Sequence, residues 1–360
     1  MRIGILTYHW ATNYGAVLQC YALQTFLEDL GHSVHVINYK PRINDDSLYS
    51  FLKFKKYVHL RTYINRYLQN RKKEHSLAYF RANKLNLTKR LYSYHNISQV
   101  VTGYDVVISG SDQVLNPTFL MHGEGNNIIT PAYFLGFPFV GRKLGYALSF
   151  GCTSYPQEEL LIASKYIGEF DFIGVREETG VDIVASMGRG DAIVTPDPTL
   201  LMRASLYHQL ASECSLQFEK NYVYSFFIRN IEERKAIINR VFKDDVVLWN
   251  NDDNNYSLQS WLSRIKYSKF VVTDSFHCMV MCLKLHVPFA VVTEQKGRVD
   301  MNDRFYTLLE KMQLADVIVY KADVECLSNI SIINFDWDKI DEVLESFIIL
   351  GEKFLARAIS

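Results

Sequence analysis

The chain has 360 residues, which is more than one ordinary hydrophobic core supports and indicates two domains. Its 39 Lys and Arg balance its 39 Asp and Glu, so the net charge argues against nucleic acid as the partner. We find no signal-peptide pattern and no apolar run of membrane-spanning length, and we expect a soluble cytoplasmic protein. The six cysteines form no CxxC pair, and all but Cys278 and Cys282, which share one helical face, lie far apart, which favours reduced, packed thiols and no bound metal.

Apolar runs alternate with helical patterns from the first residues, which is typical of α/β proteins. The opening predicts a strand at 3–7, a helix at 16–30 and a strand at 34–38. Further apolar runs predict strands at 106–109, 144–149, 172–175 and 192–194, which together form one mainly parallel sheet. The rigid turn Thr195-Pro196-Asp197-Pro198-Thr199 then ends the first domain near residue 200.

The alternation restarts after this turn and predicts a second parallel sheet, with strands at 222–228, 246–249, 270–273, 289–293 and 317–320. The sequence therefore predicts two Rossmann-like domains that face a cleft. We assign residues 1–200, with a basic helical insertion at about 48–90, to the first domain and 201–337 to the second. Residues 338–360 are predicted to form a C-terminal helix that crosses back to the first domain.

His277 follows the predicted strand at 270–273 and precedes an apolar helical stretch, so it is expected where a strand meets a helix. The first turn of such a helix presents unpaired N–H groups to phosphate or carboxylate, and an imidazole there can donate a proton near neutral pH. The alternative is that Asp274 or Ser275 only caps the helix and that His277 is a structural histidine.

Two loops in the first half are expected at the carboxyl ends of neighbouring strands, where ligands bind in open α/β sheets. The first contains Asn13, Tyr14 and Gly15, and the second runs from Ser109 to Gln113. Neither contains a GxGxxG or P-loop pattern, so a nucleotide site has weak support. Their amide, carboxylate and small side chains suit the hydroxyl groups of a carbohydrate, although a tight turn at Gly15 explains that loop equally well.

Several segments resemble the polysaccharide pyruvyl transferase family in their order and spacing. They are the stretch 13–23, Gly110-Ser111-Asp112-Gln113, the strand end 146–151, Val175-Arg176-Glu177, Asp197-Pro198-Thr199, Thr273-Asp274-Ser275-Phe276-His277, and Arg304-Phe305 before Leu308-Leu309. The resemblance implies a fold like that of GT-B glycosyltransferases. It also implies transfer of pyruvate from phosphoenolpyruvate to a sugar as a ketal, in capsule or exopolysaccharide biosynthesis, with no other cofactor.

The resemblance also suggests roles for individual residues. His277 is the candidate acid, and Asp112 would orient or deprotonate the acceptor hydroxyl. The donor would be bound by Arg176, whose alternative is a surface ion pair with Glu177 or Glu178, and by Ser275, Arg298 and Arg304. The acceptor would be bound by Asn13, Tyr14, Gly15, Ser111 and Gln113. Some members carry Arg where this chain has Ser275, and many carry Gly where it has Cys278, so the donor pocket is expected to differ.

Residues 51–90 hold twelve Lys or Arg against the single acidic residue Glu74, a net charge of +11. Tyr57, Leu60, Ile64 and Tyr67 fall on one helical face, as in a basic amphipathic helix that lies on an anionic membrane. A solvated helix that covers the first domain is the alternative. Membrane docking would suit an acceptor sugar on a lipid diphosphate carrier. Two other functions stay open: a GT-B glycosyltransferase that uses a nucleotide sugar, and a non-catalytic glycan-binding relative.

Overall fold

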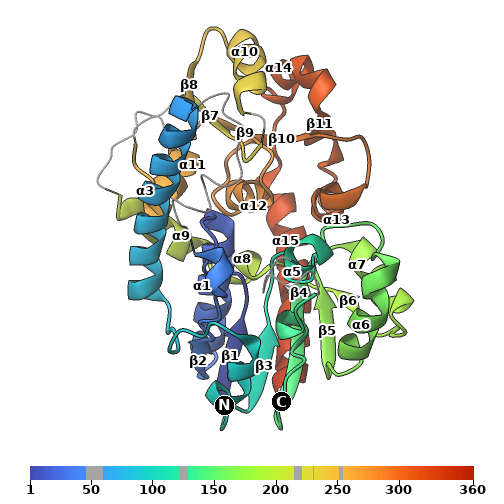
Figure 1. Ribbon diagram of the computed structural model, residues 1–360. Coiled ribbons are helices and arrows are strands. Elements are labelled where there is room, and N and C mark those ends of the chain that lie inside the picture. Colours follow the sequence, from blue (N-terminus) through green and yellow to red (C-terminus); the bar gives the residue numbers. More distant parts are fainter. Residues whose placement is uncertain (46–59, 122–128, 215–220, 230, 251–253) are drawn as a thin grey trace.

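The computed structural model describes residues 1–45, 60–121, 129–214, 221–229, 231–250 and 254–360. Two parallel sheets lie one above the other, each flanked by helices (Figure 1). The predicted α/β class with two Rossmann-like, GT-B-like sheets is confirmed.

The first sheet has six parallel strands in the order β2-β1-β3-β4-β5-β6. Its strands are β1 (Arg2–Leu6), β2 (Ser33–Val36), β3 (Val106–Ser109), β4 (Arg142–Leu148), β5 (Phe172–Val175) and β6 (Ile193–Val194). The helices of this half are α1 (Tyr14–Asp29), α3 (Leu60–Lys84), α4 (Ile97–Val100), α5 (Pro117–Met121), α6 (Gln157–Ile167) and α7 (Glu178–Ser186). Short 3-10 turns lie at η1 (Arg42–Asn44), η2 (Tyr94–Asn96) and η3 (Ala132–Phe134).

The second sheet has five parallel strands in the order β11-β10-β9-β7-β8. They are β7 (Tyr222–Phe226), β8 (Val246–Trp249), β9 (Phe270–Thr273), β10 (Phe289–Thr293) and β11 (Ile318–Tyr320). Helices α8 (Pro198–Leu201) and α9 (Ala204–Ser212) connect the two halves, and the second half adds α10 (Ile231–Val241), α11 (Leu258–Tyr267), α12 (Phe276–Lys284), α13 (Asp303–Leu309) and α14 (Leu327–Ile330). Its 3-10 turns are η4 (Asp300–Asn302), η5 (Ala315–Val317) and η6 (Lys321–Cys326).

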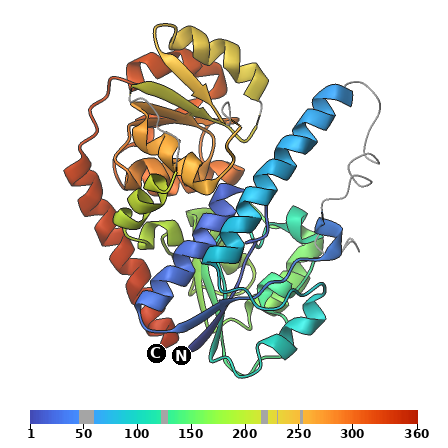
Figure 2. The same cartoon turned by 90° about the vertical axis from the view of Figure 1, so that its left-hand side faces the viewer.

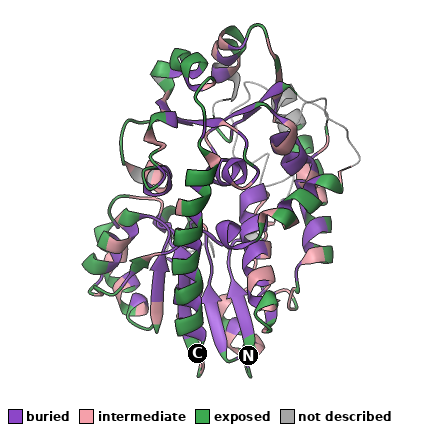
Figure 3. Cartoon of the chain, turned by 180° about the vertical axis from the view of Figure 1, so that it is seen from behind, coloured by how far each residue is buried: buried purple, intermediate pink, exposed green. Residues whose placement is uncertain are grey.

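Helix α15 (Trp337–Ile359) starts beside the second sheet and runs along the back of the first (Figures 1 and 3). Its Phe354 ring lies 6.0 Å from the ring of Tyr146 on β4, and Arg142 Nη1 donates to the carbonyl of Ala358 over 3.1 Å. Gly351 permits this approach, because a Cβ there would lie 2.5 Å from the Pro196 ring. One helix is therefore attached to both halves of the molecule.

None of the helices in the described part of the chain is long and apolar enough to span a membrane.

Helix α3 is the described part of the predicted basic insertion, whose residues 48–59, including Tyr57, lie outside the described residues. Its C-terminal half packs on α1, where the Phe80 ring lies 5.4 Å from that of Tyr21. The other end extends along the side of the molecule (Figure 2), and its side chains Ile64 and Leu68 are 45% and 49% exposed. The helix thus covers the first domain with one end and presents apolar side chains to solvent at the other.

Candidate active site

A cavity of about 640 Å³ lies between the two halves, at the carboxyl ends of their strands. Loops that follow β1, β3, β9 and β10 all contribute to its wall, as expected for a ligand site in open α/β sheets. Of the residues predicted for the site, the wall contains Asn13, Asp112, Gln113, Ser275, His277 and Arg304. Segments far apart in the chain therefore meet at one place.

His277 lies in the first turn of α12, where Ser275 is the N-cap and accepts a hydrogen bond from Cys278 N over 3.4 Å. The ring packs on the first turn of α1 in the other half. A Cβ on Gly15 would lie only 2.1 Å from His277 Nδ1, so no larger residue fits at Gly15 while the ring stays in place. The role of Gly15 is therefore to make room for the imidazole.

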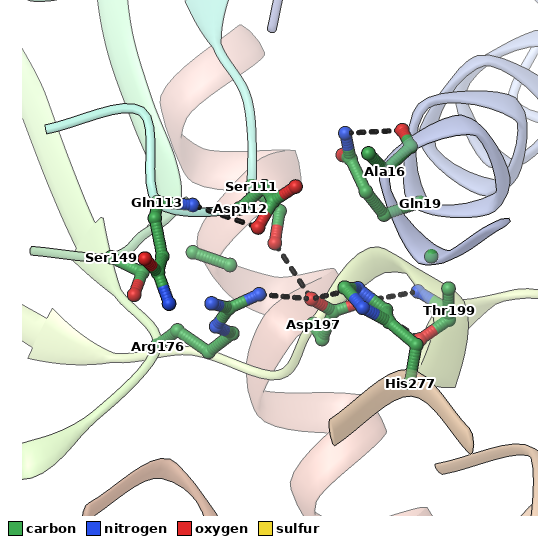
Figure 4. Close-up of polar contacts among 12 residues, drawn as sticks. Ala16, Gln19, Ser111, Asp112, Gln113, Ser149, Arg176, Asp197, Thr199 and His277 are labelled. Carbon is green, nitrogen blue, oxygen red and sulfur yellow. Dashed lines mark hydrogen bonds and ion pairs between the residues drawn. The ribbon is translucent and has the colours of Figure 1, made fainter. Parts of the chain in front are cut away.

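Four side chains converge on the buried carboxylate of Asp197 at the start of α8 (Figure 4). Oδ2 accepts hydrogen bonds from Ser111 Oγ over 2.7 Å and from Arg176 Nη1 over 3.1 Å. His277 Nε2 lies 3.5 Å from the same oxygen. Oδ1 accepts from the backbone N and the Oγ1 of Thr199. Asp197 thus fixes His277 and Arg176 relative to each other.

The charges around Asp197 keep it ionised. Burial alone raises the pKa of this carboxyl group, but the neighbouring His277 and Arg176, together with the hydrogen bond from Thr199, outweigh it and hold the pKa well below its usual range. Sequence reasoning treated Asp197 only as part of a turn and of a family motif. The missed indication was an acidic residue in the turn that follows the last strand of the first sheet, β6.

Arg176 lies beneath the cavity rather than in its wall. Its side chain is almost fully buried, bonded to Asp197, and its guanidinium carbon lies 4.9 Å from the centre of the Phe276 ring. Nε is 3.6 Å from Glu177 Oε2, and Nη2 has no hydrogen-bond partner among the described residues. The alternative ion pair with Glu177 is therefore present, but it is buried rather than at the surface. Arg176 is linked to His277, the predicted acid, through Asp197.

Of the arginines predicted for the donor site, Arg304 is the one that lines the cavity. It lies over the same Phe276 ring, at 5.6 Å, and no hydrogen bond or ion pair joins it to any residue in the described ranges. Burial, together with the neighbouring Arg176 charge, lowers the pKa of Arg304 from its usual value to about 10. A bound anion at this position would offset both effects.

Asp112 and Gln113 form part of the wall on the side of the first sheet. Asp112 has a left-handed backbone, with φ of 81°, and its Oδ1 accepts from Gln113 N over 2.9 Å. Gln113 Nε2 donates to Met301 Sδ of the other half, and Arg229 Nη2 donates to the same sulfur over 3.4 Å. The two halves thus touch across the cavity at Met301.

Other residues predicted for the site lie away from the cavity wall. The Tyr14 ring stacks on Trp261, and its hydroxyl donates to the carbonyl of Tyr256, so it joins the two halves. Arg298 binds Asp303 over 2.7 Å, and Asp303 in turn accepts from the backbone N of Thr179. Ser111 is buried under Asp197.

Asn13 and Ser275 line the cavity but also cap helices. Asn13 Oδ1 accepts from the backbone N of Gly15 and of Ala16 at the start of α1. The capping interpretation is therefore correct for Ser275, and the cap made by Asn13 is a finding of the structure. This cap leaves the Asn13 amide nitrogen free to donate a hydrogen bond. Asp274 binds the backbone of Ile228 and Arg229 instead of capping α12.

Solved structures with low sequence identity share the fold. UDP-N-acetylglucosamine 2-epimerase from Rickettsia bellii matches with a TM-score of 0.53 and 9% identity, covering 99% of this chain and 96% of that one. S. aureus MnaA, solved with UDP, matches with a TM-score of 0.51 and 12% identity over the same shares. No curated protein sequence matches this chain. Residues 13–296 match the family described as polysaccharide pyruvyl transferase, and the chain belongs to that family.

Proposed function

We propose that the protein transfers the pyruvyl group of phosphoenolpyruvate to a sugar of a polysaccharide precursor, where it forms a ketal. The observation that carries the proposal is the cavity that holds His277 beside Arg304, a guanidinium without an acidic partner in the described part of the chain. A proton donor next to an unpaired cation suits a substrate that is anionic and must be protonated on carbon.

The donor binds at the second-sheet side of the cavity. Arg304 binds the phosphate or the carboxylate, and the backbone N–H groups in the first turn of α12 stabilise the other anionic group. Arg176, which sequence analysis assigned to the donor carboxylate, acts as a positioning residue through Asp197. Arg298 is left out of the donor site because it is paired with Asp303 and Glu310.

The reaction balances without a metal or a redox cofactor. His277 donates a proton to the methylene carbon, which becomes the methyl group. One sugar hydroxyl adds to the central carbon and loses its proton, which restores the acid. The carbon–oxygen bond to phosphate then breaks, and a second hydroxyl of the sugar adds and gives up its proton to the departing phosphate. Asp112 orients the first hydroxyl from the opposite wall.

The experiment that tests the function combines the protein with phosphoenolpyruvate and lipid-linked polysaccharide intermediates. We expect a pyruvyl group on the sugar by mass spectrometry and one inorganic phosphate released per transfer. UDP- and GDP-sugars serve as the comparison donors. Sugar transfer from one of them, without reaction of phosphoenolpyruvate, would identify a glycosyltransferase, and acceptor binding without any transfer would identify a non-catalytic relative.

Replacing Asp112 with Asn is expected to raise the apparent KM for the sugar or to slow its attack by about tenfold or more, since the amide lacks the negative charge that orients the hydroxyl. The affinity for phosphoenolpyruvate should change little, because Arg304 and α12 lie on the other wall. Calorimetric titration of the donor and steady-state kinetics with the acceptor separate the two effects. Lost donor binding would show that the walls are assigned the wrong way round.

The exposed end of α3 is proposed to dock on an anionic membrane near the lipid-linked acceptor. Ile64 and Leu68 are solvent-exposed, as are Arg71 and Lys72 one turn further on. We expect binding to phosphatidylglycerol-containing vesicles that weakens steeply above physiological salt, because the attraction is electrostatic.

The double variant I64S/L68S should weaken vesicle binding in a sedimentation assay. I332S removes an apolar side chain that is 82% exposed in the second half, between α14 and α15, and is the matched control. Equal binding by both variants would disprove docking through α3.

A further inference from the structure

The two walls of the cavity differ in chemistry. The second-sheet side contains Arg229, Asp274, His277, Glu294 and Arg304, which are charged or titratable. The first-sheet side contains aromatic rings, which we call the aromatic wall: Tyr8, Trp10, Tyr39, Phe119 and Tyr133. The charged and titratable side chains of the second-sheet side suffice to bind a small anion. The aromatic wall therefore suits a ligand of another kind.

The rings of the aromatic wall hold one another in fixed orientations. Tyr8 lies at its centre, with ring centroids 4.5 Å from Tyr133, 5.6 Å from Trp10 and 6.4 Å from Phe119, all edge to face. Trp10 Nε1 donates to the hydroxyl of Tyr133 over 3.4 Å. Tyr8, Tyr39 and Tyr133 are buried, whereas Trp10 is half-buried and Phe119 is 49% exposed. Trp10 and Phe119 are therefore the rings that offer surface to a ligand.

Polar groups surround these rings on the same side of the cavity. Asn13, Asn44, Asp112 and Gln113 supply amide and carboxylate groups, and the Lys40 amine lies 5.6 Å from the centre of the Trp10 ring. A ligand that fits must present an apolar face to the rings and hydrogen-bonding groups along its edge. A pyranose ring has this form, because its C–H groups gather on one face while its hydroxyls point outward.

We propose that the aromatic wall is the acceptor subsite, with a pyranose of the glycan stacked on Trp10 and the following sugar on Phe119 at the exposed end. This inference rests on the proposed function for the identity of the reaction, but the binding it describes does not require phosphoenolpyruvate. A cavity of about 640 Å³ holds a three-carbon phosphoester and a sugar together.

The test measures sugar binding to the full-length protein without a donor. Methyl pyranosides of glucose, galactose and mannose are titrated by saturation-transfer NMR, with mannitol as a polyol that has hydroxyls but no pyranose face. We expect at least one pyranoside to bind and mannitol not to bind. W10A should weaken that binding about tenfold or more, and W10Y, which keeps a ring, should lose less. Y79A, at an exposed position of α3 away from the cavity wall, should bind like the unmodified protein.

The outcomes separate this inference from the proposed function. Unchanged pyranoside binding in W10A, equal binding of mannitol, or no pyranoside binding at all would overturn the subsite. Pyruvyl transfer with an acceptor KM that W10A does not alter would overturn it too, while the function stands. Binding that depends on Trp10, in a protein that transfers no pyruvyl group, would support the subsite and reject the donor chemistry.

Discussion

Replacing His277 with Ala is expected to lower turnover at least ~100-fold, the usual effect of removing a general acid. G15A should have a similar effect although it leaves every functional group in place. The new methyl group would lie 2.1 Å from His277 Nδ1 and 2.8 Å from His277 Cβ, so the ring must leave its position. Alanine is a better helix former than glycine within α1, which argues against an effect through unfolding. Single-turnover kinetics measures the rate of the reaction in both variants, and thermal denaturation measures their stability.

The matched control is G190A, because a Cβ at Gly190 meets nothing within 4 Å. It should keep normal turnover. Near-normal rates in H277A would remove that residue from the mechanism. A slow H277A with a fast G15A would instead mean that the helix accommodates the methyl group by shifting α1 against α12.

Replacing Asp197 with Asn is expected to reduce both stability and turnover. The amide has one acceptor and one donor side, so it cannot accept from Arg176 and Ser111 at one end and from Thr199 N at the other. It also leaves the buried Arg176 charge without its Asp197 partner, and such a loss costs about 3–5 kcal/mol. Urea unfolding should show this decrease, and turnover should fall by about a hundredfold because His277 loses its orienting contact.

The dependence of protein stability on acidic pH provides a second measurement for D197N. The pKa of Asp197 is lower in the folded protein than in the unfolded chain, so its contribution to stability is complete above about pH 4 and is lost as the pH falls through the folded value. The stability difference between D197N and the unmodified protein should therefore shrink in acid.

D191N is the control for this second variant, since Asp191 pairs with Arg189 at the surface and its side chain is 59% exposed. A surface pair contributes about 0–1 kcal/mol. The double variant D197N/R176M completes a thermodynamic cycle that isolates the coupling of the two buried charges. Additive effects would show that Asp197 does not act through Arg176.

The sequence predicts both sheets because their strands are short, mostly apolar runs separated by helical patterns. The same reasoning places His277 and Asp112 at the carboxyl ends of strands, and in the structure both line one cavity. Parallel α/β topology makes this inference possible, since every strand in such a sheet ends at the same edge.

The sequence does not predict where the side chains point or which partners they bind. Arg298 and Arg304 lie six positions apart and look alike as candidates, yet one binds Asp303 while the other reaches the cavity. Tyr14 and Gly15 belong to one motif, but the first joins the two halves and the second makes room for a ring. Trp10 has no predicted role because its hydrogen-bond partner Tyr133 lies 123 residues further along the chain, in η3. Such contacts depend on tertiary packing.

The position of α15 has a consequence for biosynthesis. Leu355, Ala358 and Ile359 are buried at the back of the first sheet, although they follow the whole second half in the chain and are therefore translated after it. Domains generally fold in order as they leave the ribosome. Here the N-terminal sheet stays uncovered on that face until α15 has been translated, and a fragment that stops near residue 200 would expose apolar surface and aggregate. The core of the first half is thus completed only after the second half has been translated.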